Sequence, residues 1–195
     1  TRGTKRMTRT NLYVHVNTVD KKVLSHPTEV PENWSNIYGF SSLTDTELSD
    51  LSDKHHPNEA WIKFDSSFAT DDYTYDSGWL EGAKGTIKLV YKKQRQEAIK
   101  KGVSYNSIIF DADAETQTKM NIKKDSSATS FKWKYNNTFY TLSKSDITAV
   151  HNALDDYIQK CYDMEANYVS QIESVTDAAG LRTFTLDGTW PTNSY

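Results

Sequence analysis

The sequence predicts an α+β protein, with a small β-rich N-terminal part and a C-terminal domain that holds a β-hairpin, short helices and one long helix. Three patterns indicate this class. Apolar and polar residues alternate from Leu12 to Val16, and two aromatic runs meet at Asn136-Asn137. An apolar repeat spaced by three and four residues fills the last third of the chain. Period two is typical of a half-buried strand, and the longer repeat is typical of a helix.

The N-terminal part should begin with a basic flexible arm over residues 1–10, which has no apolar period. A β-rich attachment domain is expected over residues 11–83. The alternating strand near Leu12 should form a hairpin with Val23-Leu24, and Trp61–Phe64 reads as another strand. Thr44 and Glu47 match a capping box, which predicts a short helix through Leu51.

Gly78, Gly82 and Gly85 predict a flexible connection, so the C-terminal domain is expected over residues 84–195. Its first helix should present Ile87 to Ala98 on one face and end at Gly102, a residue suited to the left-handed C-cap position. A single strand over residues 103–110 and a helix over residues 113–124 should follow.

The last third predicts a hairpin over residues 131–141 and a long helix over about residues 144–175. Ser143 and Asp146 match a capping box at the start of that helix. Seven apolar residues then follow at spacings of three and four: Ile147, Val150, Leu154, Tyr157, Cys161, Met164 and Tyr168. A helix of this length cannot bury all its apolar residues on one small sheet, so part of it is expected to contact a partner.

Composition narrows the class of protein. The net charge is −3 and the pI about 5.9, which argues against nucleic-acid binding through overall charge. Residues 44–83 hold ten acids, whereas residues 84–101 hold seven bases and one acid. Such segregation suits subunits that pack head-to-tail. Cys161 is the single cysteine, and no stretch predicts a membrane span or a signal peptide, so we expect synthesis in a reducing cytoplasm.

Few residues suggest chemistry. Asp111, Asp113 and Glu115 alternate as in a calcium loop, but the glycine and glutamate that an EF-hand requires further along are missing. His55-His56 lack the spacing of paired metal ligands. No nucleophile, phosphate-loop or dinucleotide motif is found. We therefore expect no catalytic, cofactor-binding or metal-binding residues, and a protein that is not an enzyme.

The order of several features in the C-terminal half resembles a known domain. A basic helix ends in glycine, an extended stretch leads to an aspartate-rich turn and a helix, an aromatic hairpin enters a long helix, and Trp-Pro closes the pattern. Here these are Arg95–Gly102, Tyr105–Asp113, Trp133, Leu142-Ser143 and Trp190-Pro191. Over about residues 91–191 the chain resembles an uncharacterised C-terminal domain of tailed-bacteriophage tail-fibre and tail-associated structural proteins.

The resemblance implies a structural protein of a phage tail, near the baseplate or as a tail-fibre attachment or adaptor. It would be located in the virion and bind other tail proteins and copies of itself, with a trimer among the symmetric arrangements. An assembly chaperone absent from the virion and a host-glycan receptor-binding module are the alternatives. The expected contact residues are basic ones in the arm and apolar ones on the long helix: Arg2, Lys5, Arg6, Arg9, Tyr157, Met164, Tyr168 and Ile172.

Overall fold

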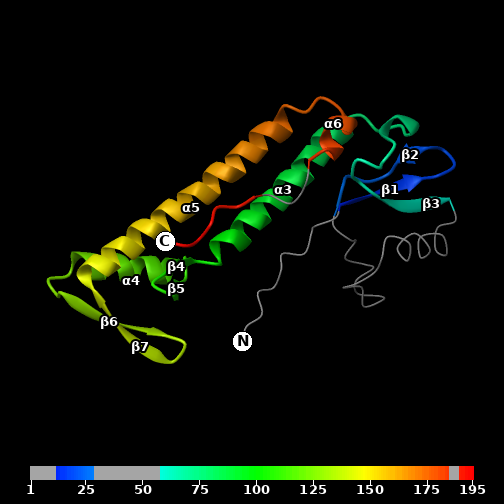
Figure 1. Ribbon diagram of the computed structural model, residues 1–195. Coiled ribbons are helices and arrows are strands. Elements are labelled where there is room, and N and C mark those ends of the chain that lie inside the picture. Colours follow the sequence, from blue (N-terminus) through cyan, green and yellow to red (C-terminus); the bar gives the residue numbers. More distant parts are fainter. Residues whose placement is uncertain (1–11, 29–57, 185–188) are drawn as a thin grey trace. The chain divides into compact units, whose positions relative to one another are not determined.

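The computed structural model describes residues 12–28, 58–184 and 189–195 (Figure 1). The described chain divides into two compact units. The first unit contains residues 12–28, 58–91 and 168–184, and the second contains residues 92–167 and 189–195. The mixed α+β class is confirmed. The predicted arm and the predicted helix from Thr44 to Leu51 lie outside the described residues.

A three-stranded antiparallel sheet forms the β-rich part of the first unit. Its strands are β1 (Tyr13–Asn17), β2 (Lys22–Val23) and β3 (Glu59–Lys63), in the order β2-β1-β3. Val14 and Val16 are fully buried on one face, which is the arrangement that the alternating sequence predicts. The predicted hairpin between β1 and β2 and the predicted strand at Trp61 are therefore confirmed.

Helix α3 (Trp79–Ile99) begins earlier than the sequence suggests. Gly82 and Gly85 lie inside it, not in a flexible connection, and the expected division between residues 83 and 84 falls within it. Burial of Trp79 accounts for the early start, since its indole Nε1 donates to the Ser25 carbonyl at 2.8 Å. Gly82 allows close packing there, because a Cβ would lie 2.2 Å from Nε2 of His26.

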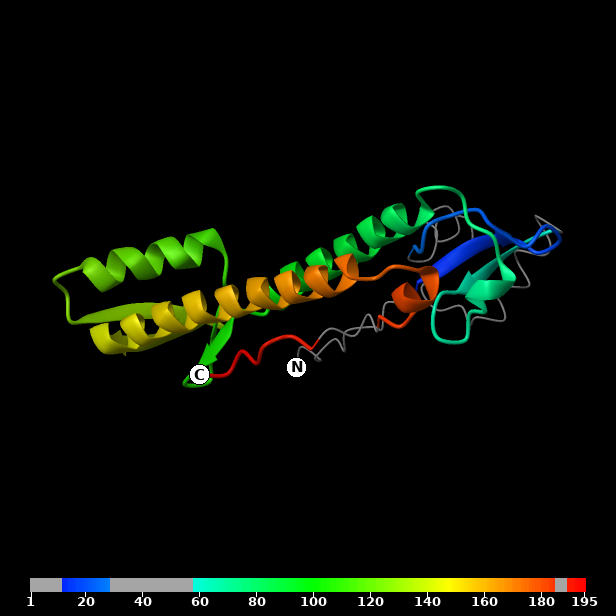
Figure 2. The same cartoon turned by 90° about the horizontal axis from the view of Figure 1, so that it is seen from above.

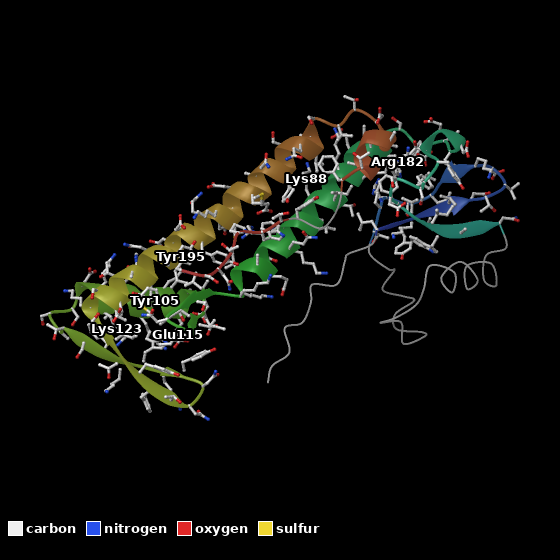
Figure 3. All side chains as sticks on the ribbon, viewed as in Figure 1. Lys88, Tyr105, Glu115, Lys123, Arg182 and Tyr195 are labelled. Atoms are coloured by element: carbon white, nitrogen blue, oxygen red, sulfur yellow. The ribbon has the colours of Figure 1, made fainter. Side chains whose placement is uncertain are left out.

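The end of helix α5 (Lys144–Glu173) is held by two lysines of α3 within the first unit. Nζ of Lys84 donates to the Glu173 carbonyl at 3.2 Å, and Lys88 pairs with the Glu173 carboxylate (Figure 3). The hydrogen bond from Lys88 holds the pKa of Glu173 below its usual value. Cations are favourable at this end of a helix because the last carbonyls carry partial negative charge.

The second unit contains two hairpins. Residues 103–110 form strands β4 (Val103–Tyr105) and β5 (Ile108–Phe110), whereas the sequence predicted one continuous strand. The chain turns at Asn106 and Ser107, which adopt φ values of 48° and 64°. This turn returns the chain so that Ile108 and Phe110 are both buried with Val103. Burial of both ends of the segment thus explains the break.

The remaining elements of the second unit follow the prediction closely. Helix α4 (Ala114–Asp125) precedes strands β6 (Ser130–Tyr135) and β7 (Thr138–Ser143), which pair around Asn136 and Asn137. Both asparagines have positive φ, 47° and 61°, as a two-residue hairpin turn requires. The long helix α5 has 30 residues, and a short helix α6 (Ala178–Arg182) follows it.

The core of the second unit lies between α5, α4 and the two hairpins. Figure 2 shows α4 alongside the first turns of α5. The predicted apolar stripe is buried from Ile147 to Cys161, together with Phe110 and Met120. The predicted end of α3 is also confirmed, because Gly102 follows it with φ of 64°.

The segment at residues 193–195 adds a further pairing to the β4–β5 hairpin. Ser104 donates its amide to the Asn193 carbonyl at 2.7 Å and accepts from the Tyr195 amide at 3.0 Å. The Tyr195 hydroxyl donates to Asp156 of α5 at 2.7 Å (Figure 3). Partial burial and the bond to this carboxylate raise the pKa of Tyr195 to about 12. The segment therefore joins β4 to α5.

The predicted capping box at the start of α5 is present and gives the helix a pH-dependent contribution. The Asp146 carboxylate accepts from the Ser143 amide at 2.8 Å, and the Asp146 amide donates to the Ser143 hydroxyl at 3.1 Å. The hydroxyl and amide bonds from Ser143 hold the pKa of Asp146 below its usual value. Because folding lowers this pKa, the stabilisation is complete above the unfolded pKa of about 3.9. It is lost as pH falls through the lower folded value.

Replacing Asp146 by alanine should therefore lower the melting temperature at pH 7, and the difference from wild type should shrink below about pH 4. Thermal unfolding followed by circular dichroism from pH 7 to pH 2 measures both quantities. A difference that stays constant across this range would show that the charge of Asp146 contributes nothing.

Candidate protein interface

The β6–β7 hairpin presents two faces with different environments. Its register pairs Phe131 with Leu142 and Trp133 with Tyr140, whereas Lys132 pairs with Thr141. Alternate residues of a strand point to opposite faces, so these pairs separate into an aromatic face and a basic face. The hairpin joins the end of α4 to the start of α5 (Figure 1).

The aromatic face packs against the core of the second unit. Leu142 is 4% exposed, and the Trp133 ring lies 5.3 Å from the Phe110 ring, centroid to centroid. Nζ of Lys123, on α4, lies 4.9 Å from the centroid of the Phe131 ring, and Figure 3 shows Lys123 beside the hairpin. A two-stranded hairpin is marginally stable alone, and this packing provides the stabilisation that it needs.

The opposite face is exposed and is here called the outer hairpin face. It consists of Lys132, Lys134, Phe139 and Thr141. Phe139 is 66% exposed. Nζ of Lys134 lies 5.9 Å from the Phe139 centroid, and Nζ of Lys132 donates to the Thr141 hydroxyl at 2.6 Å. Both lysines thus have neutral neighbours, and residues 126–143 contain no acid that could compensate their charge.

The backbone of the hairpin also offers edges. Within the part of the chain that the structure describes, β6 and β7 form a sheet of two strands, so each has one edge without a neighbouring strand. Unpaired strand edges and exposed aromatic side chains are features of surfaces that bind other polypeptides. The outer hairpin face is therefore the candidate contact surface of the second unit.

The apolar contact residues predicted on the long helix are placed largely inside the chain. Tyr157 is 1% exposed and donates its hydroxyl to the Ala98 carbonyl at 2.6 Å. Ile172 is fully buried. Tyr168 is half-buried and stacks on Tyr91 with centroids 4.3 Å apart, and Met164 is also half-buried. Most of this stripe therefore packs in the core of the chain itself. The sequence did not point to the outer hairpin face, because the alternation of residues 131–141 indicates only a hairpin.

The remaining residues considered from the sequence either lie outside the described part of the chain or have structural roles. Arg2, Lys5, Arg6 and Arg9 lie outside the described residues, as do the histidines at 55 and 56. Asp113 caps α4 by accepting from the Thr116 amide at 2.6 Å, which gives a structural role to one of the alternating acids that did not fit a calcium loop. Over residues 12–28, 58–184 and 189–195, no three metal-ligating side chains converge.

The single cysteine of the chain lies in the core of the second unit. Cys161 is buried, and burial raises the pKa of its thiol. Among the described helices, none combines the length and apolar character that a membrane span requires.

The fold and the exposed hairpin define an α+β protein with a basic, aromatic surface suited to protein contacts. Residues 83–185, just over half of the chain, match the family described as "Domain of unknown function (DUF4376)", and the chain belongs to that family. Neither a curated protein nor a solved structure matches the chain. The family region contains α3 from residue 83 onward, both hairpins of the second unit, α4, α5 and α6.

Proposed function

We propose that this chain is a structural component of a bacteriophage tail, at the baseplate or at the attachment of a tail fibre. It acts through protein–protein contacts and has no catalytic role. Its place is in the virion, where it binds other tail proteins and further copies of itself. The observation that carries the proposal is the outer hairpin face, which exposes Phe139 beside Lys134, and residues 126–143 contain no acid.

The order of elements in the second unit supports the tail assignment. The resemblance to tail-associated proteins rests on a basic helix that ends in glycine, an aromatic hairpin and a long capped helix. Each of these is present as α3 with Gly102, β6–β7, and α5 with its Ser143 cap. The match to the DUF4376 family, over residues 83–185, overlaps most of this region, and the description of the family assigns it no role.

Mass spectrometry of purified tail particles tests the proposal. Particles should be isolated from a culture that produces them, and the peptides of this chain should be quantified against those of the tail-tube protein. We expect a fixed stoichiometry across preparations. Absence from mature particles, with the chain present in the lysate, would contradict the structural role and favour the assembly chaperone.

A binding experiment separates the receptor alternative. If the chain bound host polysaccharide, exposed aromatics such as Phe139 and Tyr140 would serve as platforms for sugar rings. The proposed role predicts that a glycan array gives no signal with the wild-type chain. Strong binding that alanine at Phe139 abolishes would replace the structural proposal with a receptor-binding one.

A further inference from the structure

We infer that the outer hairpin face binds the acidic surface around Asp71 and Asp72 of a second copy of this chain. This inference rests on the proposed function, a subunit that acts through protein contacts, and names the partner of that same surface. Two different surfaces of each copy would be used. The association is therefore head-to-tail and forms a closed ring or an open filament.

The basic side of this interface is the outer hairpin face. Lys132 and Lys134 project from adjacent positions of one face of β6, and neither forms an ion pair with a described residue. Phe139 lies across from Lys134 and supplies apolar area. Two ammonium groups beside an exposed ring make a surface that favours carboxylates and aromatic side chains.

The acidic side lies in the first unit. Residues 64–83 contain five acids and no base. Asp65, Asp76 and Glu81 are paired with Lys63, Lys22 and Lys84. Asp71 and Asp72, in the short 3-10 helix η1 (Thr70–Asp72), are exposed and form no ion pair within the described part of the chain. They are the carboxylates of this segment that remain available to a partner.

Aromatic side chains accompany the two carboxylates. Tyr73 is half-buried and stacks on Phe68 with centroids 5.0 Å apart, and the Tyr75 hydroxyl donates to the Thr70 carbonyl at 3.1 Å. Burial and the nearby charge of Asp72 raise the pKa of Tyr73. Around Asp71 and Asp72, which form no ion pair with a described residue, the surface also contains the Tyr73 ring, with Nζ of Lys21 5.5 Å from its centroid. The two carboxylates and this ring complement Lys132, Lys134 and Phe139.

The balance of charges favours a second copy over a nucleic acid as the occupant. The net charge of −3 repels a nucleic acid more strongly than a second copy, because a nucleic acid carries a far higher density of negative charge. A second copy offers carboxylates and matching aromatic area at one place. The hairpin lysines of that second copy remain available to a third copy. Both surfaces of every copy are therefore occupied, except at the ends of an open assembly.

A charge-exchange experiment tests the inference. One variant carries Lys132→Glu and Lys134→Glu, and the other carries Asp71→Lys and Asp72→Lys. Analytical ultracentrifugation of the full chain at high micromolar concentration and low salt should show association of the wild type. Each variant alone should associate at least about tenfold more weakly, because like charges then face each other. An equimolar mixture should regain association, since the acidic hairpin of one variant meets the basic surface of the other.

The control replaces Lys92, an exposed lysine of α3, and Lys100, an exposed lysine just after that helix, by glutamate. It changes the net charge as much as the hairpin variant does and should associate like the wild type. A wild-type chain that remains monomeric, or variants whose mixture stays dissociated, would overturn the inference. Binding of a single-stranded oligonucleotide without self-association would also overturn it. None of these results bears on the presence of the chain in tail particles, which tests the proposed function separately.

Discussion

Replacing Gly102 by alanine is expected to lower the free energy of unfolding by about 2–5 kcal/mol, which combines left-handed backbone strain with overpacking. Gly102 follows α3 with φ of 64°, a conformation that costs little only for glycine. A Cβ at this position would lie 2.1 Å from the carbonyl oxygen of Phe110. That oxygen belongs to the backbone, so β5 itself would have to move to relieve the contact.

Alanine at Gly85 provides the matched control. Gly85 lies inside α3, and a Cβ there would meet no atom within 4 Å. Alanine should therefore raise the free energy of unfolding by about 0.5–1 kcal/mol, because it restricts the unfolded chain and favours the helix. Urea unfolding of both variants measures the two changes. Equal effects at the two positions would contradict the account of how α3 ends.

The second large effect is expected at the ion pair between Arg95 of α3 and Glu165 of α5. The two side chains are 10% and 17% exposed, and Nε of Arg95 donates to the Glu165 carboxylate. The guanidinium also lies 4.2 Å from the centroid of the Tyr162 ring. Replacing Arg95 by methionine leaves Glu165 largely buried without its partner. The expected loss of unfolding free energy is about 3–5 kcal/mol.

A double variant separates the pair from the packing around it. With Arg95→Met and Glu165→Leu together, no charge is left uncompensated, and most of the lost stability should return. A double-mutant cycle in urea gives the coupling energy directly. If the double variant were as unstable as Arg95→Met alone, the cost would arise from lost packing on Tyr162 and not from the isolated carboxylate.

Local signals in the sequence predict much of the second unit. The asparagine pair at 136–137 specifies a turn with positive φ, and the aromatic runs on either side contain the matching period of two. The Ser143 and Asp146 box marks the start of α5 to within one residue. Such signals work because each involves residues close in the chain, so no distant contact is needed to interpret them.

Features that depend on distant contacts could not be predicted in this way. The early start of α3 depends on Trp79 reaching the Ser25 carbonyl, and the split of residues 103–110 depends on burying both of its ends. The pairing of Ser104 with Asn193 and Tyr195 joins segments about ninety residues apart. The sequence also places Tyr157 on the apolar stripe of the long helix, but it does not show that other residues of the same chain bury this side chain.

The outer hairpin face could not be predicted from the sequence for the same reason. Lys132 and Lys134 are recognisable as outward residues only once the register with β7 is known. Their isolation from carboxylates depends on where every neighbouring acid lies in space. The sequence therefore predicts contacts on the long helix and the basic arm and does not single out the hairpin.

Lysine acetylation footprinting tests the central claim, that the outer hairpin face is a protein contact, most directly. The extent of modification at Lys132 and Lys134 would be compared between the purified chain and intact tail particles, with Lys92 as the internal reference. We expect strong modification of both hairpin lysines in the purified chain and a several-fold decrease in the particle. Equal modification of Lys132 and Lys134 in the two samples, relative to Lys92, would contradict it.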